Sequence, residues 1–370
     1  MKKALALLLT LVLTLGFGLT ALAEATYEIA MITDLGTVDD KGFNQFTWKG
    51  VEEFALANGK TCNYYKPAEG TTNAYLDEID KAVAAGAKVV VTPGYMFEVP
   101  IFIAQDKYPD VHFILIDGFP NNGEIDEATG DYTEARTNDN VVGIKFAEEQ
   151  VGYLAGYSIV MDGHTKIGFM GGQAVPAVIR YGYGFVQGAE AAAEVLGLAE
   201  VDLMYHYSGV FWPTPEVQTL AASWYSSGVT AIFSCGGGLV SSVVAAAEAS
   251  ENGKVIGVDV DQSDLSPTVV TSALKSLQSE VELMLTAYYE GTFPGGQSLT
   301  LGAAENAIGF NMETSRFEKF SQADYDTLFA KFAAGEIELL RDTKMDADGK
   351  KLSVPLTEIP TSIVKVEEVI

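Results

Sequence analysis

The sequence contains little of the chemistry that marks an enzyme. Its 370 residues include only two cysteines and three histidines. It has no G-x-S-x-G, H-E-x-x-H, P-loop or C-x-x-C motif, which excludes the common hydrolase, zinc and phosphate-transfer signatures. Asp259, Asp261 and Asp264 have the spacing of a calcium loop, but its sixth position is Asp264 rather than glycine and its twelfth is Val270 rather than glutamate. We therefore expect no catalytic site, no metal and no cofactor.

The two cysteines, Cys62 and Cys235, are far apart in the sequence, and each lies beside an expected strand. A disulfide would suit an exported protein. Two buried free thiols are the favoured alternative, because separate domains seldom bring two Cα atoms within bonding range.

Basic residues are also scarce. The 23 lysines and arginines face 50 aspartates and glutamates, which gives a net charge of −27. Such a surface repels nucleic acid and anionic lipid, so neither is an expected partner.

Long apolar runs are limited to the N-terminus. Lys2 and Lys3 precede an apolar run that ends near Leu19, and Ala21-Leu22-Ala23 follows it. These are the three parts of a secretory signal peptide, residues 1–23, with cleavage expected after Ala23. A membrane anchor is the alternative, but the run is shorter than the ~20 residues of a comfortable span and ends in small residues.

The remaining chain, too long for one ordinary core, alternates between strand and helix patterns, which predicts α/β lobes with parallel sheets. The expected strands lie near residues 28–33, 61–66, 89–92, 112–117, 166–170, 202–207, 231–234 and 255–259. The expected helices span residues 43–58, 73–85, 148–161, 180–196, 215–226 and 239–251. The Gly182-Tyr183-Gly184 segment has the wrong spacing for a dinucleotide fingerprint and predicts a close-packed helix. The loop 119–139 has little apolar periodicity, so it is a candidate crossing point between the lobes.

One stretch, Ile29 to Trp48, combines a buried strand with polar and aromatic residues directly after it. Asp34 stands where the strand ends, and Phe43 and Asn44 open the following helix. In an α/β sheet, ligands collect at the carboxyl ends of the strands. A carboxylate, a ring and an amide on one such loop suit a flat polar ligand.

This stretch closely resembles the first strand and helix of the basic membrane protein family, the purine nucleoside receptor type of substrate-binding protein for ABC importers. The resemblance continues through YPDVHFILID (108–117), NVVGIKFAEEQVGYLAG (140–156), KIGFMGG (166–172) and VIGVDVDQ (255–262). It covers nearly the whole mature chain. Most members of the family carry a lipid-bearing cysteine after the signal peptide, whereas no cysteine lies near Ala23. A released or differently anchored protein is therefore expected.

The resemblance implies a two-lobed type I periplasmic-binding fold, in which each lobe is a doubly wound parallel sheet and the chain crosses three times. The first lobe would comprise residues 24–139 and about 262–309, and the second residues 140–261 and about 310–370. The segment from Thr271 to Tyr289 would return to the first lobe.

Several further residues at the expected strand ends are candidate ligand contacts. Phe211 and Trp212 lie in a rigid loop, and the family's stacking phenylalanines match Phe43 and Phe211; core packing is the alternative for Phe43. Gly236 and Gly237 suit close approach of the backbone to a ligand, or simply a tight turn.

The remaining candidates are charged. The resemblance implies that Asp34 and Asp117 accept hydrogen bonds from a purine ring and that an aspartate and a lysine hold the ribose. The lysine matches Lys275, which is expected near the start of a helix. For the aspartate, strand alternation puts Asp259 and Asp261 on one face, and we favour Asp259 as the first residue past the apolar strand.

The leading hypothesis is a monomeric protein that is exported to the outside of the plasma membrane. It captures a nucleoside, for which a purine nucleoside is the favoured choice, and delivers it to an ABC permease. A sugar or another small polar ligand on the same fold is the alternative. An enzyme acting on nucleosides is a third hypothesis, for which Asp34 and Asp259 would have to serve as base and acid without a metal or a Ser/His pair.

Overall fold

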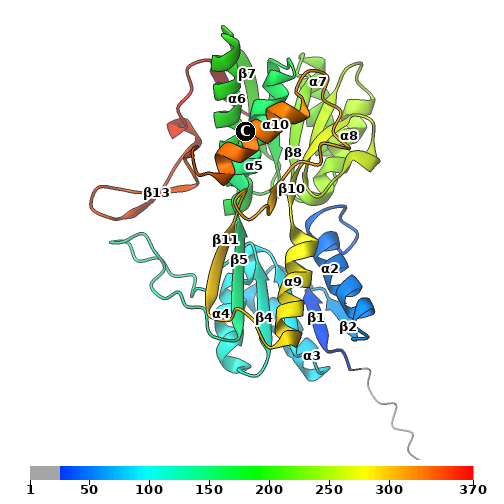
Figure 1. Cartoon of the computed structure of the whole chain (residues 1–370), viewed down its shortest axis with the longest axis vertical. Coiled ribbons are helices and arrows are strands. Elements are labelled where there is room, and N and C mark those ends of the chain that lie inside the picture. Colours follow the sequence, from blue (N-terminus) through cyan, green and yellow to red (C-terminus); the bar gives the residue numbers. More distant parts are fainter. Residues whose placement is uncertain (1–25, 370) are drawn as a thin grey trace, which may run out of the picture.

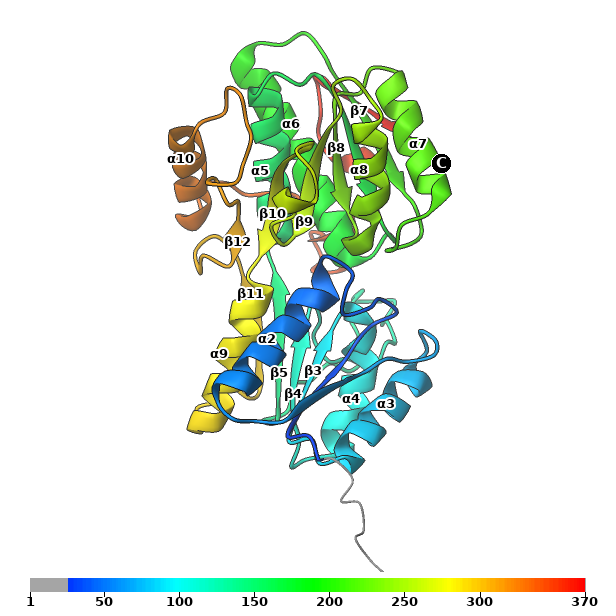
Figure 2. The ribbon, with the colours of Figure 1, turned by 90° about the vertical axis from the view of Figure 1, so that its right-hand side faces the viewer.

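The computed structural model describes residues 26–369, so the expected signal peptide lies outside the described residues. Two lobes lie one above the other, each built around a sheet (Figures 1 and 2). None of the helices within residues 26–369 combines the length and the apolar character that a membrane span requires.

The first lobe has a six-stranded, wholly parallel sheet in the order β11-β5-β4-β3-β1-β2. Its strands are β1 (Ile29–Ile32), β2 (Cys62–Tyr65), β3 (Val89–Pro93), β4 (His112–Ile116), β5 (Val141–Phe146) and β11 (Gln297–Leu301). Its helices are α2 (Phe43–Ala57), α3 (Thr72–Ala84), α4 (Glu98–Lys107) and α9 (Leu277–Glu290), with the short helix η1 (Tyr95–Phe97). The central strands β1 and β3 are buried along their whole length, as expected where helices cover both faces of a parallel sheet.

The second lobe has a seven-stranded sheet in the order β12-β10-β9-β8-β6-β7-β15, parallel except for β12. Its strands are β6 (Lys166–Gly171), β7 (Val201–Tyr207), β8 (Ala231–Cys235), β9 (Lys254–Asp259), β10 (Val269–Lys275), β12 (Ile308–Gly309) and β15 (Val364–Glu368). Its helices are α5 (Glu148–Met161), α6 (Pro176–Leu196), α7 (Pro215–Ser226), α8 (Val240–Glu248) and α10 (Gln322–Ala333). The short helices η2 (Gly237–Leu239), η3 (Ser263–Leu265) and η4 (Leu356–Glu358) and the hairpin of β13 (Thr343–Met345) and β14 (Lys351–Ser353) complete it.

Helices α5 and α6 lie unusually close together, and glycines permit this. A Cβ on Gly184 would come within 2.1 Å of the Glu149 carbonyl oxygen, and one on Gly188 would come equally close to that of Tyr153. The prediction of a close-packed helix around Gly182-Tyr183-Gly184 is thus confirmed. The contact also fixes two residues of the site, Glu148 and Arg180, against each other.

The chain crosses between the sheets three times within the described residues, after β5, after β10 and after β11. These crossings differ from the boundaries expected from sequence. The loop 119–139 does not cross, because β5, assigned above to the second lobe, pairs with β4 in the first. Conversely, β10 pairs with β9 in the second lobe, and only α9 of the segment from Thr271 to Tyr289 returns. Both errors arise because sheet membership depends on pairing between distant strands, which local patterns do not encode.

Candidate functional site

A cavity of about 530 Å³ lies between the two lobes, where the carboxyl ends of both sheets face each other. All nine candidate residues from the sequence line it. They are Asp34, Phe43, Asn44 and Asp117 from the first lobe, and Phe211, Gly236, Gly237, Asp259 and Lys275 from the second. Strand ends far apart in the sequence thus converge on one site.

The wall from the first lobe is a network of three side chains. Asp34 Oδ1 accepts hydrogen bonds from Asn44 Nδ2 at 2.8 Å and from the Gly36 backbone N–H at 2.6 Å. Asp40 Oδ2 accepts from Asn44 Nδ2 at 3.0 Å, and its carboxylate also binds the backbone N–H groups that open α2. Both amide hydrogens of Asn44 are therefore engaged by carboxylates. Asn44 holds Asp34 in place rather than presenting free donors to the cavity.

Burial raises the pKa of Asp34 to about 6, even though Gly36 and Asn44 donate hydrogen bonds to it. A buried carboxylate of this kind is costly to ionise unless further donors reach it. A ligand that brings N–H or O–H groups would supply such donors.

Lys275 lies at the centre of the cavity floor, and its side chain is 1% exposed. Its Nζ is 2.6 Å from Asp117 Oδ2, 3.0 Å from Glu148 Oε1 and 4.0 Å from Asp259 Oδ1. Burial would lower the pKa of Lys275, but these carboxylates outweigh it and raise the pKa above its usual range. The lysine therefore remains a buried cation.

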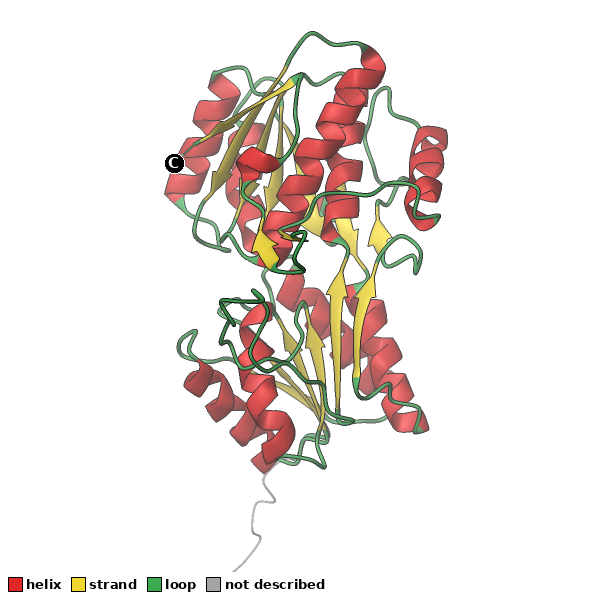
Figure 3. Ribbon diagram, turned by 90° about the vertical axis from the view of Figure 1, so that its left-hand side faces the viewer, coloured by secondary structure: helices red, strands yellow, loops and turns green. Residues whose placement is uncertain are grey.

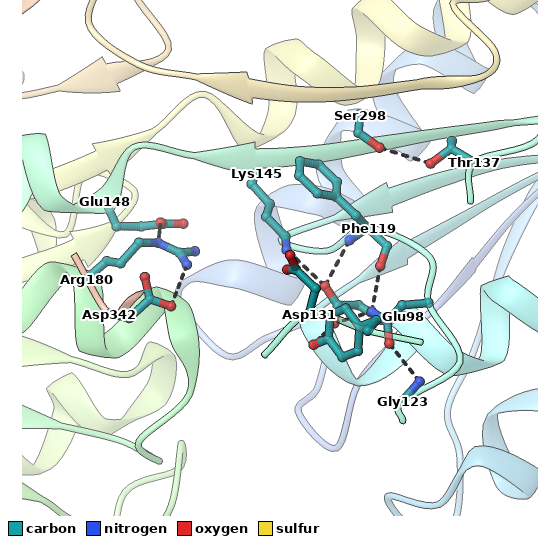
Figure 4. Close-up of polar contacts among 12 residues, drawn as sticks. Glu98, Phe119, Gly123, Asp131, Thr137, Lys145, Glu148, Arg180, Ser298 and Asp342 are labelled. Carbon is teal, nitrogen blue, oxygen red and sulfur yellow. Dashed lines mark hydrogen bonds and ion pairs between the residues drawn. The ribbon is translucent and has the colours of Figure 1, made fainter. Parts of the chain in front are cut away.

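Glu148, at the start of α5, extends this network further within the second lobe. Its Oε2 accepts a hydrogen bond from Arg180 Nε at 2.6 Å, and Arg180 Nη1 lies 3.4 Å from Asp342 Oδ2 (Figure 4). Burial would raise the pKa of Glu148, but Arg180 and Lys275 together lower it to about 2. The expectation that Lys275 lies near the start of a helix is confirmed, because α9 begins at Leu277, but Lys275 itself is the last residue of β10 in the second lobe.

Asp259 ends β9 and faces the cavity, with a positive φ of 66° and the Tyr181 hydroxyl 3.5 Å from its Oδ1. Burial raises the pKa of Asp259 to about 7, against the attraction of Lys275. Asp261 instead accepts hydrogen bonds from Thr314 Oγ1 at 2.6 Å and Asn311 Nδ2 at 2.9 Å. Of the two aspartates left open by strand alternation, Asp259 is thus the one that lines the cavity.

Aromatic rings line the cavity from both lobes. Phe43 opens α2, and Phe211 follows β7 in the loop with Trp212, which is 47% exposed. The Phe211 ring lies directly over Gly172, where a Cβ would come within 2.4 Å of it. Both phenylalanines are partly buried and line the cavity.

The two lobes touch each other across the cavity. Lys41 O accepts a hydrogen bond from Gln262 Nε2 of the second lobe at 2.9 Å. A Cβ on Gly42 would stand 3.1 Å from Gly237 Cα, and Gly237 itself has φ of +48°. Glycine at both positions lets the loop after β1 meet the turn after β8. Together with the ion pair between Asp117 and Lys275, these contacts define a closed arrangement of the lobes.

Sequence reasoning missed Tyr181, which lines the cavity, and Glu148 and Arg180, which form the ion-pair network behind Lys275. The available signal was a charged residue, Arg180, inside the apolar and glycine-rich first half of α6. A buried arginine requires a buried acidic partner, but the sequence does not say which acid provides it. Both cysteines are free, as the favoured alternative expected, but only Cys235, at the cavity, is buried, whereas Cys62 on β2 is partly exposed.

The geometry defines the class of protein. Two doubly wound lobes, three chain crossings and a cavity between the carboxyl ends of both sheets are the features of a two-lobed binding protein with the type I periplasmic-binding fold. Residues 27–339 match the family described as ABC transporter substrate-binding protein PnrA-like, and the chain belongs to this family. It is therefore a substrate-binding protein of an ABC transporter and not an enzyme.

Individual relatives agree with this assignment. A CD4+ T-cell-stimulating antigen of Listeria monocytogenes is 29% identical over 85% of this chain and 88% of the relative. The ABC transporter nucleoside-binding protein BmpA of Lactococcus lactis is 25% identical over 81% of this chain and 86% of the relative. An ABC transporter solute-binding protein from Aeropyrum pernix K1, 21% identical, has a TM-score of 0.72 over 86% of this chain and 94% of that one, and shares the fold.

Proposed function

We propose that the cavity binds a nucleoside, and that a purine nucleoside suits it best. The observation that carries the proposal is the pairing of rings from opposite lobes, Phe43 and Phe211, above a floor of buried charged groups. The rings would stack on the two faces of a base, which contributes ~1–3 kcal/mol per stacked ring. The volume lies within the roughly 300–1,000 Å³ typical of small-molecule sites.

The polar groups suit the two halves of such a ligand. Asp34 and Asp117 would accept hydrogen bonds from base N–H groups, because a carboxylate is an acceptor only. Asp259 and Lys275 would bind the sugar hydroxyls, one as acceptor and the other as donor. A donor-rich ligand would thus offset the cost of ionising Asp34 and Asp259 in a buried site.

The charge of the site also bears on the choice of ligand. Five aspartates line the cavity against three lysines, and Lys275 is already paired with carboxylates. A phosphate group would meet net repulsion here. We infer that the ligand is a neutral nucleoside rather than a nucleotide. The name of the Lactococcus lactis relative, a nucleoside-binding protein, supports the same choice.

The protein would act outside the plasma membrane, where it would close around the nucleoside and deliver it to its permease. Contacts from both lobes to one ligand stabilise the closed state, which the permease can then recognise. The partners are therefore a nucleoside and an ABC permease, and the binding protein would act as a monomer.

A thermal-shift panel tests the ligand class. Purine and pyrimidine nucleosides, free bases, pentoses and nucleoside monophosphates are each titrated against the purified protein. A ligand that binds only the folded state raises the unfolding midpoint with its concentration. We expect the largest shift from purine nucleosides and little from the monophosphates. A shift with pentoses but not with nucleosides would refute the proposal and favour a sugar.

A further inference from the structure

Two projecting arms, one from each lobe, meet on the same side of the molecule (Figures 1 and 3). The first-lobe ribbon is residues 119–136, and the second-lobe hairpin is residues 342–354, which include β13 and β14. The Lys351 backbone N–H donates a hydrogen bond to Thr129 O at 2.7 Å. Lys351 Nζ lies 3.2 Å from Asp131 Oδ1, and Lys350 Nζ donates to Glu127 O. We call these contacts the clasp.

The first-lobe ribbon is an ordered structure with its own anchor. Antiparallel bridges pair Asn121 with Ala135 and Ile125 with Tyr132. At its base, the buried carboxylate of Glu98 accepts hydrogen bonds from the Phe119 backbone N–H at 2.9 Å and from Asn121 Nδ2 at 2.9 Å (Figure 4). The ribbon is therefore held firmly by the lobe from which it projects.

The second-lobe hairpin is anchored equally well. β13 and β14 pair in antiparallel register, and the Tyr183 hydroxyl donates to Val354 O at 2.7 Å. Asp342, at the foot of β13, lies 3.4 Å from Arg180 Nη1. Because each arm is rigidly attached to its own lobe, a rotation of one lobe away from the other must pull the arms apart.

The roots of both arms lie in the ion-pair network of the cavity. Asp117 pairs with Lys275 and stands two residues before the ribbon begins. Lys275 pairs with Glu148, and Arg180 links Glu148 to Asp342 at the foot of the hairpin. The clasp and the cavity are thus linked through these polar contacts. Both are formed in the same closed arrangement of the two lobes.

We propose that the clasp is a latch between the lobes that stabilises the closed state and so sets the affinity for ligand. The apparent dissociation constant equals the intrinsic one divided by the fraction of protein in the binding-competent state. Contacts that exist only when the lobes are closed raise that fraction without touching the ligand. The hairpin lies beyond residues 27–339, the segment that matches the family.

Gly130→Ala is the sharpest disruption of the clasp. Gly130 has φ of +72°, and a Cβ there would stand 1.9 Å from the Lys351 carbonyl oxygen, a clash that separating the arms would relieve. Gly335→Ala is the matched control. Gly335 has φ of +69°, but a Cβ there would have nothing within 4 Å, so it carries the same backbone strain outside the clasp.

The measurement is the distance distribution between spin labels on the ligand-free protein. Leu56→Cys in α2 and Val195→Cys in α6, at positions 83% and 66% exposed, carry the labels on a Cys62→Ser background. Cys235 lines the cavity and would be accessible to the label in the open state, so Cys235→Ser is included as well. Because no ligand is present, the result does not depend on whether the ligand is a nucleoside.

We expect a dominant closed population in the parent and in Gly335→Ala. In Gly130→Ala the ratio of closed to open protein should fall about three- to tenfold, the value of roughly one net main-chain hydrogen bond. A parent found mainly open, or a Gly130→Ala distribution identical to that of Gly335→Ala, would overturn the proposal.

A charge exchange provides a second test that does not strain the backbone. Lys351→Glu and Asp131→Lys each place like charges across the clasp, so each alone should open the protein. The double variant restores an opposite pair and should return the distribution toward that of the parent. Single variants with the parent's distribution, or a double variant as open as the singles, would contradict a latch at this contact.

Discussion

Replacing Asp259 with asparagine should stabilise the ligand-free protein at neutral and higher pH. The Asp259 carboxyl is buried beside Lys275, and its pKa is raised to about 7 from an ordinary value of 3.8. Asparagine is nearly isosteric and tolerates the positive φ of 66° at this position. The substitution therefore removes the titratable group with little strain in the backbone.

The magnitude follows from the shift of the pKa. Because the folded state holds its proton more tightly than the unfolded chain, ionising Asp259 costs stability as the pH rises from about 3.8 through 7. A rise of the pKa from 3.8 to about 7 corresponds to a loss of about 4 kcal/mol in the free energy of unfolding once Asp259 is ionised. We expect the difference in the free energy of unfolding, Asp259→Asn minus parent, to be near zero at pH 3.5 and to rise to at most about 4 kcal/mol at pH 8. The loss of one partner of Lys275 makes this an upper bound.

Urea unfolding followed by circular dichroism from pH 3.5 to 8 measures this difference. Asp261→Asn is the control, two residues away. Burial would raise the pKa of Asp261, but hydrogen bonds from Thr314, Ser263 and Asn311 outweigh it and lower the pKa. The ionised Asp261 carboxylate therefore stabilises the folded state at every pH above its pKa in the unfolded chain. Asp261→Asn should accordingly be less stable than the parent at pH 8. If Asp259→Asn shows no rise in its difference between pH 4 and 8, ionised Asp259 is not a cost to the fold, and the argument fails.

Three further outcomes are expected. Phe43→Ala and Phe211→Ala should each weaken nucleoside binding about ten- to a hundredfold by calorimetry, because each removes one stacking face. The circular dichroism spectrum should stay unchanged, and affinities equal to that of the parent would assign the rings to the core. Lys275→Met removes the cation that three buried carboxylates share and should lower the free energy of unfolding at pH 7 by about 3–5 kcal/mol. The exposed Lys331→Met should change it by less than about 0.5 kcal/mol, and equal effects of the two would contradict a buried ion pair. Mass spectrometry of the exported protein should find an unlipidated N-terminus at Glu24, within a residue or two; an intact leader would show that the signal peptide was misread.

The sequence by itself determined most of the local structure. Apolar runs of strand length separated by amphipathic helices placed eight strands and six helices within a few residues of their observed positions, because helix and strand periodicities are local properties. It also placed the cavity, since polar residues directly after buried strands must gather at the carboxyl edge of a parallel sheet. Five sequence segments between residues 29 and 262 resemble the family, and the match over residues 27–339 confirmed this prediction.

Only the tertiary structure decided which strand joins which sheet. β5 and β10 each joined the lobe opposite to the one expected. Both are interior strands, and their sheet is decided by pairing with β4 and with β9, which local sequence patterns do not specify. This is why Lys275, expected in the first lobe, ends a strand of the second lobe directly before α9. It is also why the acid that pairs with Arg180 became visible only once α5 and α6 were packed together.

The closed arrangement of the lobes was likewise beyond the sequence. Gly42 against Gly237 and Lys351 against Thr129 are contacts between residues about 200 positions apart, and neither has a local signature. The pKa values of Asp34 and Asp259 depend on the same closure, since a carboxylate titrates according to the water and charges around it. The sequence predicts which groups can bind a ligand and where each strand ends. The charge of these groups depends on their burial and on their distances to other charges, and these are fixed only when the two lobes meet.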